Sequence, residues 1–175
     1  MSVNVLPHLL QQISETPLTS FPYPYFYIKQ IFPEPFYEEL LRHLPDTAYF
    51  HSLEQYPTRL CLNLGKGLAS LPFPLFLFWK QLADSLYSDE LIDALLKRFE
   101  SPSKRNITVD AALIRDQSNY SIGPHTDHPN KVLSLLFYLP SSLETVLKPK
   151  FLVEYSLQVW RNHAGGESTI SIGSH

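Results

Sequence analysis

A chain of 175 residues is long enough for one domain with a sizeable core and short for two. Hydrophobic residues make up 44% and charged residues 18%, a balance that excludes an intrinsically disordered protein. The formal net charge of −3 gives no reason to expect nucleic acid or an anionic membrane as a partner. The aromatic share of 13% favours a β-rich core, because aromatic side chains suit sheets and concave pockets.

No segment of the sequence predicts secretion or membrane insertion. The N-terminus has no basic residues ahead of an apolar stretch, unlike a signal peptide. The longest apolar run, Leu68 to Trp79, contains Pro72 and Pro74 and is shorter than the roughly 20 residues that span a bilayer. We therefore expect a cytoplasmic protein with no membrane partner. The single cysteine, Cys61, lies between leucines and is interpreted as a buried structural thiol rather than a reactive one.

The first 103 residues are predicted to be mainly helical, with prolines between the elements. In chain order we predict a short helix over Val5–Ile13, a strand after the prolines of Phe21–Phe32, a helix from Pro35 to Leu44 that stops at Pro45, and a strand over Arg59–Leu64. Two helices follow, over Phe76–Leu86 and Asp89–Phe99. Ser88 is predicted to be the N-cap of the second, because two acids follow it and two basic residues occupy the last turn.

Beyond Ser103 the hydrophobic period changes to two, which indicates strands. The pattern predicts a strand over Asn106–Asp116, a strongly apolar one over Lys131–Leu139, and two weaker ones over Phe151–Trp160 and Ser168–Ile172. Helices followed by a run of strands favour an α+β protein with a sandwich or barrel.

The polar segment between the two strong strands contains the candidate chemistry, His125-Thr126-Asp127. Residues two apart on an extended segment project from the same face, so this imidazole and this carboxylate can reach one metal ion at about 2 Å each. With a second histidine they form the arrangement that leaves one side of Fe(II) open for oxygen and a co-substrate. The alternative is a surface turn whose polar side chains cap one another.

The surrounding sequence is similar to a known superfamily. Leu113–Asp116, Tyr120–Asp127 and Lys131–Pro140 resemble the first half of the jelly-roll core of the 2-oxoglutarate/Fe(II)-dependent oxygenases, of the prolyl-hydroxylase-like bacterial kind. The helix start Pro33–Leu41 and the helix around Trp79 resemble the helical lead-in of some members. The resemblance covers about residues 22–140, and residues 113–140 are its specific part.

This resemblance implies an α+β fold in one domain, residues 1–175. Residues 1–103 would form a mainly helical lead-in, packed on a jelly-roll (double-stranded β-helix) portion at residues 104–175. We expect that portion to be partial and incomplete at the C-terminus, with the chain truncated or altered after about residue 140, where the resemblance ends.

The resemblance also implies a function: a dioxygenase that uses Fe(II) and 2-oxoglutarate to hydroxylate a small-molecule or peptide substrate not identified by the sequence. His125 and Asp127 would bind the iron. After residue 140 the candidates for the third ligand are His163 and His175, and His163 is taken ahead of the terminal His175. The alternative for His163 is a loop residue beside Gly165 and Gly166. The side chains nearest to the motif that could bind 2-oxoglutarate are Tyr120, Lys131 and Arg115. Core packing for the tyrosine and a solvated strand end for each cation are the structural alternatives.

Two other functions stay open. A catalytically inactive oxygenase-fold remnant or binding protein is favoured by the lack of an arginine or lysine after either late histidine. A metal-dependent hydrolase is suggested by His125-Thr126-Asp127-His128, although Gly123 and Pro124 occupy the upstream positions where such motifs usually have another histidine.

Overall fold

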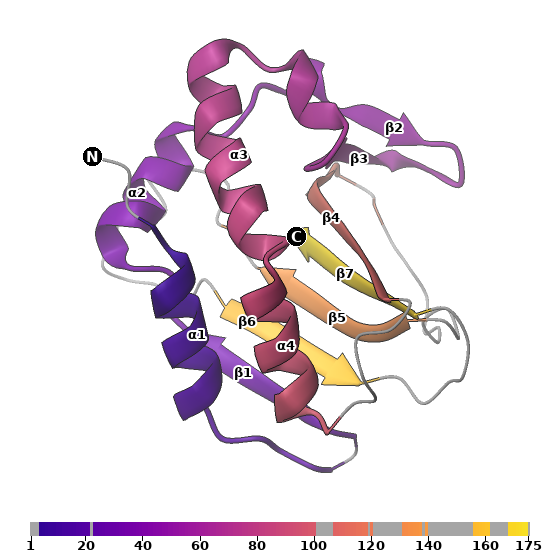
Figure 1. Cartoon of the computed structure of the whole chain (residues 1–175). Coiled ribbons are helices and arrows are strands. Elements are labelled where there is room, and N and C mark those ends of the chain that lie inside the picture. The colour runs from indigo at the N-terminus through magenta and orange to yellow at the C-terminus, as the bar shows by residue number, and fades with distance from the viewer. Residues whose placement is uncertain are drawn as a thin grey trace, which may run out of the picture.

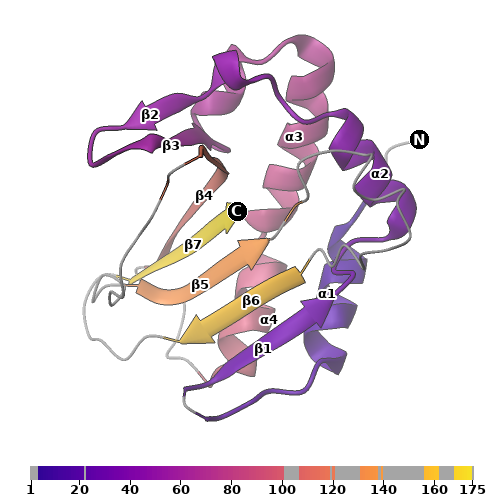
Figure 2. The same ribbon diagram turned by 180° about the vertical axis from the view of Figure 1, so that it is seen from behind.

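Helices cover one face of a mixed β-sheet, and the other face carries none of the described helices (Figures 1 and 2). The structure is a computed structural model that describes residues 4–21, 23–100, 107–118, 120, 131–137, 139, 156–161 and 168–174, the last two ranges by backbone alone. The described helices are α1 (Leu6–Glu15), α2 (Glu34–Arg42), α3 (Phe73–Leu86) and α4 (Asp89–Arg98), with short 3-10 helices at Thr47–Tyr49 and Gly67–Ser70. The described strands are β1 (Tyr25–Lys29), β2 (His51–Leu53), β3 (Tyr56–Asn63), β4 (Ile107–Asp116), β5 (Lys131–Phe137), β6 (Ser156–Arg161) and β7 (Ser168–Ser174).

Local sequence explains where the helices begin and end. The Ser88 hydroxyl accepts a hydrogen bond from the backbone N–H of Leu91 at 3.2 Å, so the predicted N-cap of α4 is confirmed. Such a cap contributes about 1 kcal/mol to helix stability. Helix α2 has Pro35 in its first turn, where the missing N–H costs nothing, and it ends at Arg42, ahead of Pro45.

The sheet order is β1-β6-β5-β7-β4-β3-β2 within the described part of the chain. Strand β7 runs parallel to both of its neighbours, β4 and β5, and the other pairs are antiparallel. Strands β4 and β5 therefore run in the same direction, and both start level with the beginning of β7: Ile107 pairs with Ser168 and Lys131 with Thr169. The end of β4 at Asp116 and the start of β5 at Lys131 therefore lie at opposite ends of the sheet.

The core lies between the helices and the sheet. Leu133 and Leu135 of β5 and Ala111 of β4 are fully buried there, and Phe137 stacks on Phe32 with 5.5 Å between ring centroids. Trp79 of α3 is also buried, and its indole Nε1–H donates to the backbone carbonyl of His43 at 2.6 Å. Burying one such large side chain contributes roughly 1.5–3 kcal/mol, so this layer supplies most of the stabilisation of the fold.

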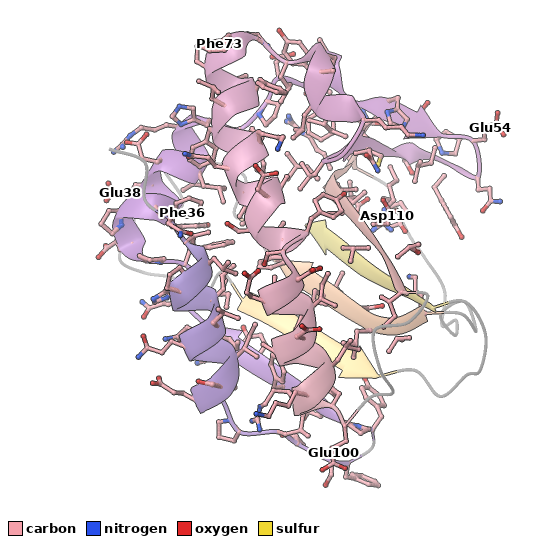
Figure 3. All side chains as sticks on the ribbon, in the orientation of Figure 1. Phe36, Glu38, Glu54, Phe73, Glu100 and Asp110 are labelled. Atoms are coloured by element: carbon pink, nitrogen blue, oxygen red, sulfur yellow. The ribbon has the colours of Figure 1, made fainter. Side chains whose placement is uncertain are left out.

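The α+β class predicted from the sequence is confirmed, and each predicted strand overlaps an observed one. Strand β2 was not predicted, because it is short and two of its three side chains are exposed. It forms a hairpin with β3 whose tip, at Glu54, projects beyond the sheet (Figure 3). Strands β1, β2 and β3 join the same sheet as the later strands. The strands described here belong to one sheet, so the jelly roll stays a prediction. No described helix has both the length and the apolar character to cross a membrane.

Glu100 provides a test of the end of α4. It follows the helix with φ of 49°, in the left-handed region where glycine is unstrained, and it lies at the end of α4 in Figure 3. We expect Glu100→Gly to raise the free energy of unfolding by about 0.5–1 kcal/mol, measured by urea denaturation. Glu90→Gly, inside the same helix, should lower it by about as much. A Glu100→Gly variant less stable than the wild type would contradict this account.

Candidate functional site

The proposed metal ligands His125, Asp127 and His163 lie outside the described residues. The first two belong to the connection between β4 and β5, and the third follows β6. Within the described ranges no group of three or more histidine, cysteine, aspartate or glutamate side chains is placed to hold a metal ion. The metal site therefore stays a prediction. The described residues that flank His125 and Asp127 in the sequence are Tyr120, after the end of β4, and Lys131, at the start of β5.

A polar cluster lies at the end of β4, on the sheet face that the described helices do not cover. Side chains alternate along a strand, and Ala111 and Leu113 of β4 face the helices, where they are buried. Asp116 has the opposite parity and therefore projects from the other face, which is toward the viewer in Figure 2. Its partner in the antiparallel register of β3 is Arg59.

Arg59 and Asp116 form a two-pronged ion pair. Arg59 Nε donates to Asp116 Oδ1 at 2.7 Å, and Arg59 Nη2 donates to Asp116 Oδ2 at 2.9 Å. The two side chains are only 16% and 23% exposed, so water screens the pair weakly. The hydrogen bonds to Asp116 raise the pKa of the Arg59 guanidinium against the opposing effect of burial, so it stays charged.

Tyr120 is held against this ion pair by a turn after β4. The Gln117 N–H donates to the Thr58 carbonyl of β3 at 2.9 Å, and the Tyr120 N–H donates to the Gln117 carbonyl at 3.0 Å. The turn brings the Tyr120 ring under the Arg59 guanidinium, whose central carbon is 4.1 Å from the ring centroid. Tyr56 meets the same ring edge-on, with 6.2 Å between centroids.

The Tyr120 hydroxyl is a buried hydrogen-bond donor. Its oxygen is shielded from solvent and has no hydrogen-bond partner among the described residues. Burial raises the pKa of Tyr120 most, the Arg59 charge lowers it, and Asp116 and Tyr56 raise it again, for a net increase above its ordinary 10.0. The phenol is therefore neutral at physiological pH and can donate to an anion.

The three predicted 2-oxoglutarate residues are not brought together. Arg115 follows Ile114 on β4 and faces away from Asp116, and its Nη1 donates to Thr47 Oγ1 at 2.8 Å. Lys131 begins β5, at the opposite end of the sheet from Tyr120, because β4 and β5 are parallel. Of the three, Tyr120 alone belongs to the cluster at the end of β4. The role of each in binding a co-substrate stays a prediction.

Cys61 follows Arg59 by two residues on β3, so it lies on the same face of the sheet, where it pairs with Ile114. Its thiol is buried, as predicted, and burial raises the pKa of the thiol above its ordinary 9.0. A thiol in this state is a weak nucleophile, because only the thiolate reacts readily.

Sequence reasoning missed Arg59 and Asp116 as site residues. Opposite charges stand near the ends of two predicted strands, but only the register of the pairing places one against the other. No family model, curated protein or solved structure matches the chain. The chemistry of the site is therefore inferred from its own residues.

The raised pKa of Tyr120 predicts a specific pH dependence of stability. In the unfolded chain the phenol ionises near pH 10, whereas in the folded protein it stays protonated to higher pH. The contribution of Tyr120 to the free energy of unfolding is then fully present below pH 10. It is lost as pH rises through the pKa of Tyr120 in the folded protein, because over that range the unfolded state binds fewer protons. In urea denaturation between pH 9 and about 11, the wild type should lose stability more steeply than Tyr120→Phe. Equal slopes would contradict the shift.

Proposed function

We propose that this protein is an Fe(II)- and 2-oxoglutarate-dependent dioxygenase that hydroxylates a small-molecule or peptide substrate in the cytoplasm. His125 and Asp127 would bind the iron, with His163 as the third ligand. The proposal starts from the sequence resemblance over residues 113–140. The structural observation that carries it is the arrangement of β4 and β5, which flank the segment that contains His125 and Asp127.

In a double-stranded β-helix, successive strands alternate between two facing sheets. The first and third strands of the core therefore share a sheet, run in the same direction and have another strand between them. Strands β4 and β5 stand in this relation, with β7 between them. The proposal requires the connection between β4 and β5, which contains His125 and Asp127, to supply the second strand of such a core. At about 3.3 Å per residue, an extended segment of roughly ten residues is long enough to span the distance from the end of β4 to the level at which β5 starts.

The direction of β7 differs from a regular jelly roll, in which neighbouring strands are antiparallel. Strand β7 is parallel to both β4 and β5. It belongs to the part of the chain after residue 140, for which the sequence predicts a departure from the family pattern. The proposal therefore depends on β4, β5 and their connection rather than on the strands that follow.

Tyr120 fits the proposed co-substrate. A buried neutral hydroxyl with no partner among the described residues is suited to donate to a carboxylate, and hydrogen bonds of this type are short and strong. Imidazole and carboxylate are the ligand types of the two-histidine, one-carboxylate iron centre. When bound, the iron would couple oxygen and 2-oxoglutarate decarboxylation to hydroxylation of a C–H bond. The polypeptide would orient the co-substrate and exclude water.

Anaerobic titration tests the proposal. Adding Fe(II) and then 2-oxoglutarate to the protein should produce the weak visible charge-transfer band of the chelated complex. We expect His125→Ala to weaken iron binding by at least about 100-fold, because even outer-shell partners of a metal site contribute 10–100-fold. The matched control is His51→Ala, an exposed histidine on β2, which should behave like the wild type.

Each alternative function has its own outcome. Iron binding without the band would favour the non-catalytic remnant or binding protein. Hydrolysis of a generic ester with zinc would favour the hydrolase. Iron binding that persists unchanged in His125→Ala would show that the proposed ligands are wrong.

A further inference from the structure

We propose that Arg59 is a positioning residue: held by Asp116 and stacked on Tyr120, it fixes the direction in which the Tyr120 hydroxyl donates. The inference rests on the proposed function, because the group that receives this hydrogen bond would be a carboxylate of 2-oxoglutarate. It goes beyond that function by assigning a role to a strand of the lead-in, β3, which lies outside the specific part of the resemblance.

The Arg59 side chain has one well-defined orientation. Both oxygens of Asp116 accept from it, at 2.7 and 2.9 Å, and two parallel hydrogen bonds fix the plane of the guanidinium. Asp116 is itself fixed by the β3–β4 ladder, in which Arg59 and Asp116 are direct partners. The guanidinium is therefore a rigid flat surface beside the last residue of β4.

The Tyr120 ring is confined on three sides. The Arg59 guanidinium lies over its face at 4.1 Å, Tyr56 contacts it edge-on, and its backbone is tied back through Gln117. With the ring plane and the backbone both fixed, the bond from the ring to the hydroxyl oxygen can point in one direction only. The ring therefore has little freedom to turn its hydroxyl away from a bound anion.

This function needs an arginine rather than any cation. A planar guanidinium can bind a carboxylate with two nitrogens through its edge and stack on an aromatic ring with its face, whereas an ammonium is a point charge. Arg59→Lys therefore keeps the charge beside Asp116 and removes the surface that orients Tyr120. Arg42→Lys on α2 is the matched control, because Arg42 also contacts two carboxylates, Glu38 and Glu39, but is about half exposed.

The experiment measures Fe(II) and 2-oxoglutarate affinities separately in the full chain. We expect Arg59→Lys to weaken 2-oxoglutarate binding about tenfold and to change the iron affinity by less than about twofold. Tyr120→Phe, which removes the hydroxyl alone, should cause at least as large a loss. The double variant should bind no more weakly than Tyr120→Phe, because once the hydroxyl is gone its direction no longer matters. Arg42→Lys should match the wild type.

In the binding experiment, three outcomes would overturn the inference. They are unchanged 2-oxoglutarate affinity in Arg59→Lys, losses that multiply in the double variant, and a parallel loss of iron and 2-oxoglutarate affinity, which a general structural defect would cause.

Urea denaturation of Arg59→Lys, Tyr120→Leu and their double variant separates this inference from the proposed function. If Arg59 holds the Tyr120 ring, the effects of the two substitutions on the folding equilibrium constant should be coupled by at least about threefold. Independent effects of the two substitutions would show that Arg59 does not hold the Tyr120 ring. If the variants show this coupling but the wild-type protein gives no charge-transfer band, the contact between Arg59 and Tyr120 exists, and both the positioning role and the proposed function are overturned.

Discussion

Two strands that run in the same direction in one sheet cannot be joined by a tight turn, and this constraint governs the candidate site. Because β4 and β5 are parallel, β5 starts at the end of the sheet opposite to the one where β4 finishes, so the connection has to return between these two levels. The described helices cover one face of the sheet. The return begins at Asp116 and Tyr120, where β3 supplies both the ion-pair partner and the carbonyl that fixes the turn. The β3–β4 ladder therefore sets the point from which the connection starts.

The Arg59–Asp116 pair is better understood as a device for geometry than as a source of stability. Two charges that are mostly withdrawn from water lose hydration free energy, and their attraction often does little more than offset that loss. A two-pronged pair, however, has one favourable geometry, and it therefore restrains the orientation of the Tyr120 ring that stacks on the guanidinium. The stability of the fold comes instead from the apolar layer between helices and sheet, around Trp79, Leu133 and Phe137.

Sequence reasoning was most successful where the determining interactions are local. The Ser88 cap, the proline at the start of α2 and the alternation of Ala111 with its neighbours in β4 all involve residues within one or two turns or one strand, so the sequence predicts them. The β2 hairpin lacks an apolar pattern because it is exposed. The insertion of β7 between β4 and β5, and the pairing of Arg59 with Asp116 across 57 residues, depend on contacts between distant segments, which periodicity does not encode. Tyr120 could be selected as a candidate from its place near the motif, but the residues that hold it could not.

The charge balance of the cluster determines what kind of ligand contact Tyr120 can make. An unpaired arginine beside the phenol would lower its pKa and would itself attract a carboxylate. Here Asp116 neutralises Arg59, and burial outweighs the remaining pull of the cation, so the phenol keeps its proton. In the proposed site the anion would then be recognised by a directed O–H donor rather than by a direct ion pair with Arg59. A hydrogen bond depends on direction more strongly than an ion pair does, which is why a rigid support for the Tyr120 ring would matter.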